Sequence, residues 1–196
     1  MSRVIGGRFR GHVLSAPSGQ TTRPTSDRVR EAVFSSLVSW LGTGDHAPEA
    51  AFDGVSFLDL YAGSGAVGIE AASRGASPVR LVERDPKVAD VCRANAARLG
   101  LRMTVTRASV PTLLAAPADH AYDIVWLDPP YAVPVDEVSA AVAQLDGQGW
   151  LAPDGLVVVE RATRTPEPVF PDRLADTWSR RYGETTIHFA TRGDIA

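Results

Sequence analysis

The 196-residue chain contains a single cysteine, Cys92, and a single lysine, Lys87. One cysteine excludes an internal disulfide and a thiolate metal cluster. The four histidines are scattered without ligand spacing, so we expect no metal site. No apolar run approaches the ~20 residues that cross a bilayer, and the first residues lack the apolar centre of a signal peptide. We therefore expect a cytoplasmic protein that does not associate with membranes.

The rest of the composition is that of an ordinary globular protein, with 44% hydrophobic and 22% charged residues. The distribution of charge is more informative: six arginines against one aspartate give residues 1–30 a net charge of +5, and since the whole chain carries −3, the remainder carries −8. Basic segments attract phosphate, which arginine binds with a fork of donors, although a solvated basic surface is the plainer interpretation. The candidate RNA-binding residues are Arg3, Arg8, Arg10, Arg23, Arg28 and Arg30.

The N-terminal segment has the pattern of a glycine-punctuated β-hairpin, with short strands on either side of residues 8–11. An amphipathic helix follows and ends at Gly42, and residues 42–54 indicate a linker. We predict a basic RNA-binding extension over residues 1–42 and a catalytic domain over residues 55–196. Because the hairpin is too short for a core of its own, we interpret its arginines as contacts to rRNA phosphate. We expect removal of residues 1–20 to leave cofactor binding intact but to abolish methylation of the particle. The alternative is a lid that closes over the cofactor.

From Val55 onward, predicted strands and helices alternate, which is the pattern of a parallel sheet covered by helices. After Glu160 we expect a proline-rich loop, a short helix and an antiparallel hairpin joined at Gly183. The predicted fold class is Rossmann-like α/β, with a mostly parallel seven-stranded sheet and a C-terminal antiparallel hairpin. Strands are expected near residues 55–60, 78–83, 102–107, 122–127, 155–160, 176–182 and 185–191, and helices near 66–74, 86–99, 109–116 and 134–146.

A glycine motif closes the first of these strands. Gly63, Gly65 and Gly68 satisfy G-x-G-x-x-G, and Glu83 stands twenty residues after Gly63, where an acid can bind ribose hydroxyls. A carboxylate at Asp59 would repel a pyrophosphate but attract the cationic methionine end of S-adenosylmethionine. The motif therefore favours S-adenosylmethionine over a dinucleotide, while Asp59 as a simple turn cap is the alternative.

A second motif, YDIVWLDPPY, is an apolar strand that ends in a carboxylate, two prolines and an aromatic ring. In open α/β sheets, ligands bind at the carboxyl ends of the strands. The prolines fix the backbone, so the Asp128 carboxylate and the Pro129 carbonyl form a rigid pair of acceptors, and Tyr131 offers a flat ring. Such a site suits a planar group that bears an NH2. The alternatives are an ordinary Pro-Pro turn and a Tyr131 that packs in the core.

Taken together, DLYAGSG, the acid at Glu83 and DPPY resemble the class I methyltransferases that methylate exocyclic amino groups. More narrowly, the GGRFRG and RPTSDRVREAVFSSL segments resemble the RsmD family of small-subunit ribosomal RNA guanine methyltransferases, and the resemblance runs over nearly the whole chain. It implies methyl transfer from S-adenosylmethionine to the 2-amino group of a specific guanine in 16S rRNA within a partly assembled small subunit, by a protein that we expect to be a monomer. Carried over by position, the cofactor-binding residues are Asp59, Tyr61, Gly63, Ser64, Gly65, Glu83, Arg84 and Ser109, and the catalytic residues are Asp128, Pro129, Pro130 and Tyr131.

Three other functions share parts of this pattern. An amino methyltransferase acting on DNA adenine or on a protein glutamine would share DPPY and the glycine loop, but it would not explain an arginine-rich hairpin that resembles the ribosomal RNA family. A nicotinamide-dependent oxidoreductase would share the glycines and Glu83, but it should lack Asp59 and DPPY. A non-catalytic rRNA-binding assembly factor would not need both motifs intact.

Overall fold

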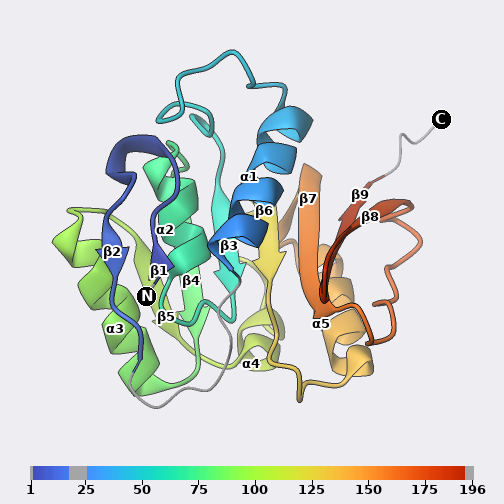
Figure 1. Cartoon of the computed structure of the whole chain (residues 1–196). Coiled ribbons are helices and arrows are strands. Elements are labelled where there is room, and N and C mark those ends of the chain that lie inside the picture. The colour runs from blue at the N-terminus through green and yellow to red at the C-terminus, as the bar shows by residue number, and fades with distance from the viewer. Residues whose placement is uncertain (1, 18–25, 193–196) are drawn as a thin grey trace. The chain divides into compact units, whose positions relative to one another are not determined.

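The computed structural model describes residues 2–17 and 26–192 (Figure 1). The chain divides into two compact units, residues 1–107 and residues 108–196. The glycine loop and the N-terminal extension belong to the first unit, and the DPPY motif belongs to the second. Arg23, one of the predicted RNA-binding residues, lies outside the described residues.

The first unit is built on three parallel strands in the order β5-β4-β3. Helix α3 begins and ends as its sequence predicts: Asp85 accepts hydrogen bonds from the backbone N–H groups of Lys87 and Val88, Pro86 takes the first helical position, and Gly100 follows the end with φ +66°. The elements are β3 (Phe57–Leu60), α2 (Ala66–Ser73), β4 (Val79–Glu83), α3 (Pro86–Arg98) and β5 (Thr104–Arg107).

The N-terminal extension folds as the predicted antiparallel hairpin, with β1 (Ser2–Arg3) paired to β2 (Val13–Leu14) and a short 3-10 helix, η1 (Gly7–Phe9), between them. In Figure 1 this hairpin lies beside α2 and α3. Val4 and Leu14 are each 1% exposed and pack with Ile69 of α2 and with Leu99. The extension is therefore part of the core of the first unit: the short hairpin has no core of its own, but it shares the core of α2 and α3.

Helix α1 (Asp27–Leu41) packs through the apolar stripe that predicted it. Its Phe34 ring contacts Phe52 and Phe57, with ring centroids 5.6 and 6.4 Å apart respectively. Gly42 ends the helix in the left-handed conformation. The segment 42–54 contains turns but no helix or strand, as expected of a linker, yet Phe52 within it is fully buried. This segment therefore contributes to the core of the unit.

The second unit contains four strands in the order β6-β7-β9-β8. β6 and β7 are parallel, whereas β9 pairs antiparallel with both β7 and β8, so the predicted C-terminal hairpin is confirmed. The elements are α4 (Val110–Leu114), β6 (Tyr122–Leu127), α5 (Val135–Gly147), β7 (Leu151–Ala162), β8 (Asp176–Tyr182) and β9 (Thr185–Thr191).

One predicted element is wrong. Between β7 and β8 the sequence predicted a short helix, but the described residues 163–175 contain only turns and irregular segments, and one of the turns is closed by a hydrogen bond from Leu174 N to Pro171 O. Pro171 is separated from the start of β8 by too few residues for more than one helical turn. Within the part of the chain that the structure describes, no helix has the length and apolar character needed to cross a membrane.

Candidate functional site

The glycine loop of the first unit has an unusual backbone. Tyr61 has φ +65°, a backbone conformation that residues other than glycine rarely adopt. Gly63 and Gly65 have φ +55° and +83°. Gly65 N donates to Ala62 O at 2.8 Å, and Gly65 is the N-cap of α2. A strained non-glycine residue at the head of a glycine loop is typical of a ligand-binding turn.

Glu83 holds this loop from the end of the neighbouring strand β4. Its Oε2 atom accepts a hydrogen bond from Gly63 N at 3.0 Å, and its Oε1 atom accepts one from Asp85 N at 2.9 Å. The sequence separation of twenty residues between Gly63 and Glu83 thus becomes a direct contact. A carboxylate has about four acceptor sites, so two backbone donors leave capacity for further hydroxyl donors.

Asp59 has a different environment from the one that its sequence position suggested. The side chain is buried, with 1% of the residue exposed, and its Oδ2 atom accepts a hydrogen bond from Gly68 N at 2.9 Å. A carboxylate at this point stabilises the N-terminal turn of α2. The structure therefore shows the turn-capping contact that the sequence left open as the alternative, and a direct contact of Asp59 with the cofactor stays a prediction.

The three glycines of the motif serve different purposes. A Cβ atom at Gly63 would meet nothing within 4 Å, so this glycine borders open space. At Gly65 it would lie 2.7 Å from Cys92 Sγ, and at Gly68 it would lie 2.1 Å from Leu81 Cδ2. A side chain at Gly65 or Gly68 would therefore collide with the residues that pack against the loop and the start of α2.

The remaining predicted cofactor residues lie at the edges of these elements. Ser64 sits between the two loop glycines, and its carbonyl accepts a hydrogen bond from Asn95 Nδ2 of α3 at 3.0 Å, a contact that the sequence did not reveal. Arg84 is exposed beyond β4. Ser109, in the second unit, caps α4 through a hydrogen bond from Thr112 N to its hydroxyl. The structure thus gives Ser109 a clear local function as a helix cap.

In the second unit, the DPPY motif follows directly on β6, as predicted. Pro129 is buried, Asp128 is half-buried, and Pro130 and Tyr131 are exposed. Tyr131 is 59% exposed, so its ring is not a core aromatic and its surface can contact a ligand. A turn closed by Val133 N donating to Pro130 O at 2.9 Å ends the motif. Rigid acceptors and an accessible ring are the two properties that the proposed chemistry needs.

A buried arginine on β7 forms a hydrogen bond with the last residue of this turn. Arg161 is 4% exposed, and its Nη2 atom donates to Val133 O at 3.0 Å. No sequence motif pointed to Arg161, although an arginine inside an apolar strand is itself unusual. Its contact fixes the end of the turn that contains Tyr131.

The predicted RNA-binding arginines divide into two groups. Arg3, Arg8, Arg10 and Arg28 are exposed, as an RNA contact requires. Arg30, in contrast, is 1% exposed. Because its guanidinium is buried, Arg30 cannot serve as a surface contact for RNA in this structure, and the sequence prediction for it is corrected.

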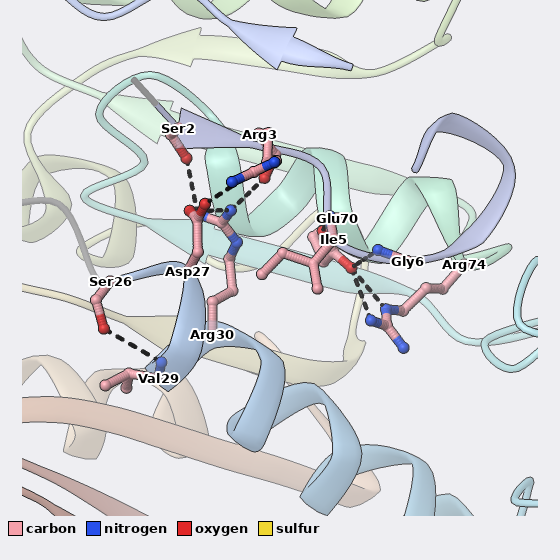
Figure 2. Close-up of polar contacts among 10 residues, drawn as sticks. All are labelled: Ser2, Arg3, Ile5, Gly6, Ser26, Asp27, Val29, Arg30, Glu70 and Arg74. Atoms are coloured by element: carbon pink, nitrogen blue, oxygen red, sulfur yellow. Dashed lines mark hydrogen bonds and ion pairs between the residues drawn. The ribbon is translucent and has the colours of Figure 1, made fainter. Parts of the chain in front are cut away.

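Arg30 instead ties α1 to the first strand of the hairpin, as Figure 2 shows. Its guanidinium donates to Ser2 Oγ at 3.0 Å, to Asp27 Oδ1 at 3.0 Å and to the carbonyl of Arg3. Burial lowers the pKa of Arg30, while the negative charges of Glu70 and Asp27 oppose that shift. Its role is to hold the extension together.

A second buried charge anchors the hairpin to α2. Glu70 is fully buried, and its carboxylate accepts hydrogen bonds from Ile5 N at 2.6 Å, Gly6 N at 2.8 Å and Arg74 Nε at 2.9 Å (Figure 2). Ser73 adds a hydrogen bond from its hydroxyl to Gly6 O at 2.6 Å. The one signal in the sequence was a lone acid inside the otherwise apolar helix AVGIEAAS.

Comparison with known proteins matches residues 2–191 to the family model described as Conserved hypothetical protein 95. The chain is 36% identical to the Escherichia coli Ribosomal RNA small subunit methyltransferase D over 171 residues, covering 86% of this chain and 79% of that protein. It is 33% identical to the Bacillus subtilis protein YlbH over 189 residues, covering 94% and 96%. The solved structure of the Escherichia coli protein yhhF has a TM-score of 0.80 at 32% identity and covers 97% of each chain.

These matches bear directly on the fold class. The predicted Rossmann-like α/β methyltransferase fold, with a mixed seven-stranded sheet, a C-terminal antiparallel hairpin and a small N-terminal two-stranded sheet, is confirmed.

Proposed function

The chain belongs to the RsmD family, described by its family model as Conserved hypothetical protein 95, and we propose that it methylates ribosomal RNA. The reaction is transfer of a methyl group from S-adenosylmethionine to the exocyclic 2-amino group of a specific guanine in 16S rRNA, on a partly assembled small subunit. One observation carries the proposal: the 36% identity, over 86% of the chain, to an Escherichia coli protein named Ribosomal RNA small subunit methyltransferase D.

The cofactor is S-adenosylmethionine, which supplies an electrophilic methyl group on a sulfonium centre. The loop from Tyr61 to Gly65 fits it, because Gly63 borders open space and Glu83 has acceptor capacity beyond its two backbone donors. In this proposal the Glu83 carboxylate would accept hydrogen bonds from the ribose hydroxyls of the cofactor. Asp59 acts indirectly, by holding the first turn of α2 through Gly68.

The DPPY motif orients the base. A guanine 2-amino group is a weak nucleophile because its lone pair is delocalised into the ring. When the Asp128 carboxylate and the Pro129 carbonyl each accept one of its N–H groups, the lone pair is directed toward the methyl group and the developing positive charge is stabilised. Tyr131, exposed at this strand end, stacks on the base. Removing the guanine from its RNA stack costs a few kcal/mol, and stacking on the tyrosine ring returns ~1–3 kcal/mol of that cost.

The exposed arginines of the hairpin supply contacts to the rRNA backbone. Arg3, Arg8 and Arg10 belong to the hairpin that Glu70 anchors to α2, so they present their charges from a fixed support. Contacts to phosphate set the orientation of a nucleic acid without reading its sequence. The alternative, an amino methyltransferase for DNA adenine or protein glutamine, does not account for a similarity to the ribosomal RNA enzyme that runs over 86% of the chain.

The test is methylation of small subunits from cells that lack the gene. The parent protein should introduce one 2-methylguanine, located by mass spectrometry of 16S rRNA fragments. Asp128→Ala should lower the single-turnover rate by roughly 100-fold to 1,000-fold, the usual effect of removing one stabilising partner of the transition state, while affinity for S-adenosylhomocysteine stays within about 2-fold. Asp154→Ala, at an exposed residue of β7, is the matched control.

Two results would contradict the proposal. If the parent modified DNA adenine or a glutamine peptide but left rRNA unmodified, the substrate would be wrong. If folded Asp128→Ala protein methylated rRNA at nearly the parent rate, the proposed orientation of the amino group would be wrong.

A further inference from the structure

Asn95 on α3 contacts two segments that are far apart in the sequence. The residue is 1% exposed, and its carboxamide exchanges two hydrogen bonds with the backbone of Ser15: Ser15 N donates to Oδ1 at 2.9 Å, and Nδ2 donates to Ser15 O at 3.0 Å. The same Nδ2 atom also donates to Ser64 O at 3.0 Å. One buried side chain therefore joins the end of the N-terminal hairpin to the glycine loop.

The contact with Ser64 is well placed to control the loop. Ser64 lies between Gly63 and Gly65, two residues in the left-handed conformation, where the chain has no regular secondary structure. Glu83 holds the N–H group of Gly63 from one side, and Asn95 holds the carbonyl of Ser64 from another. The orientation of the 62–63 and 64–65 peptide groups of the loop thus depends on these two side chains.

The contact with Ser15 links this loop to the extension. Ser15 directly follows β2, whose Leu14 is packed in the core with Ile69 of α2. Arg98 reinforces the junction by donating from Nη2 to Asn95 Oδ1 at 3.3 Å. Displacement of the hairpin would therefore pull on the residue that holds Ser64.

We propose that Asn95 is a positioning residue for cofactor binding: it couples the docking of the N-terminal extension to the conformation of the glycine loop, so that affinity for S-adenosylmethionine depends on the extension. This inference rests on the proposed function, in which the glycine loop binds that cofactor. It also replaces the sequence-based expectation that the extension and the cofactor site are independent.

The first test is the isosteric change Asn95→Asp. It retains an acceptor for Ser15 N but places an oxygen where Nδ2 faced the carbonyls of Ser15 and Ser64. Replacing a buried donor with an acceptor should weaken S-adenosylhomocysteine binding by roughly 5-fold to 50-fold in titration calorimetry. In turnover, KM for S-adenosylmethionine should rise by a similar factor, whereas kcat at saturation should stay within about 2-fold.

The second test perturbs only the extension. Ser15→Pro removes the N–H group that donates to Asn95 Oδ1 and changes no atom of the glycine loop. If the coupling exists, this change should weaken S-adenosylhomocysteine binding by roughly 3-fold to 10-fold. The combination with Asn95→Asp should be clearly less than the product of the two single effects, because both changes break the same link.

Ser73→Ala is the matched control, because it removes hairpin contacts to Gly6 O and Phe9 N but leaves the hydrogen bonds of Asn95 to Ser15 and Ser64 in place. It should lower the unfolding temperature without changing the dissociation constant. If Asn95→Asp and Ser15→Pro also lowered the unfolding temperature without changing the dissociation constant, Asn95 would have only a structural role and the inference would be overturned. If Asn95→Asp failed to fold, the dissociation constant of Ser15→Pro alone would decide. A parent protein that bound no S-adenosylhomocysteine would refute the proposed function, and this inference with it.

Discussion

Glu70→Gln should destabilise the protein strongly, because Glu70 is a fully buried carboxylate that accepts hydrogen bonds both from the N-terminal hairpin and from the Arg74 side chain. Its carboxylate accepts from Ile5 N, Gly6 N and Arg74 Nε, and Arg74 Nη2 lies 2.8 Å from Oε1. Glutamine has the same shape but only one acceptor oxygen. Its NH2 group would therefore face an N–H donor of the hairpin or of Arg74.

The magnitude follows from these contacts. Losing one hydrogen bond to a charged group costs about 1.5–3 kcal/mol, and removing one partner of a buried ion pair costs about 3–5 kcal/mol. Because Arg74 retains 12% side-chain exposure and glutamine keeps one acceptor, we expect the lower end, about 3 kcal/mol. At 2–4 °C per kcal/mol for a chain of this size, the unfolding temperature should fall by roughly 6–12 °C.

Urea unfolding followed by circular dichroism would measure the loss, with Glu31→Gln, at an exposed position of α1, as the control that should change stability by less than about 0.5 kcal/mol. Amide hydrogen exchange should accelerate at Ile5 and Gly6. A loss below about 1 kcal/mol in Glu70→Gln would refute the reasoning, since it would mean that the buried carboxylate contributes no more than an ordinary surface group.

Two further predictions concern the thiol and the basic hairpin. Burial raises the pKa of the Cys92 thiol to about 12 from an unperturbed 9.0, with smaller contributions from nearby carboxylates. As the pH rises, the unfolded state therefore loses this proton first. The contribution of the thiol to the free energy of unfolding should be constant below pH 9 and should fall as the pH rises from 9 toward 12. Urea unfolding at several pH values should show this decrease in the parent protein and not in Cys92→Ala. Replacing Arg8 and Arg10 with alanine should weaken RNA binding and flatten the log–log salt dependence by roughly 0.7–0.9 for each phosphate that is no longer neutralised, and an unchanged slope would place the RNA elsewhere.

Local signals predicted most of the fold. The bounds of β6, β8 and β9 agree with their predicted ranges, and α3 starts at the residue that its Asp-Pro cap indicates. These elements are encoded by neighbouring residues: alternation and apolar runs for strands, and caps and glycines for ends. The missing helix before β8 shows the limit of such signals, because a few turn residues after a proline cannot by themselves be told from a helical turn.

The site was less predictable, because burial and distant partners decide what a polar side chain does. The sequence identified Glu83 and Gly63 as a pair, since their spacing is a property of the motif. It could not show that Arg30 is buried or that Asp59 caps α2, because the residues next to a side chain in the sequence reveal neither its burial nor its hydrogen-bond partners. Asn95 gave no signal at all, since its partners are backbone groups that any residue type provides.

The way in which the hairpin is anchored also determines when it can fold. Its strands pair locally, Ser2 with Leu14, but its buried partners Glu70 and Asn95 lie 64 to 80 residues further along the chain. Synthesis proceeds from the N-terminus at roughly 5–20 residues per second, so the hairpin waits several seconds for α2 and α3 to be made. Contacts of such long sequence separation form slowly. The hairpin thus precedes α2 and α3 in synthesis but docks only after them, and until then its arginines and its apolar residues remain exposed together.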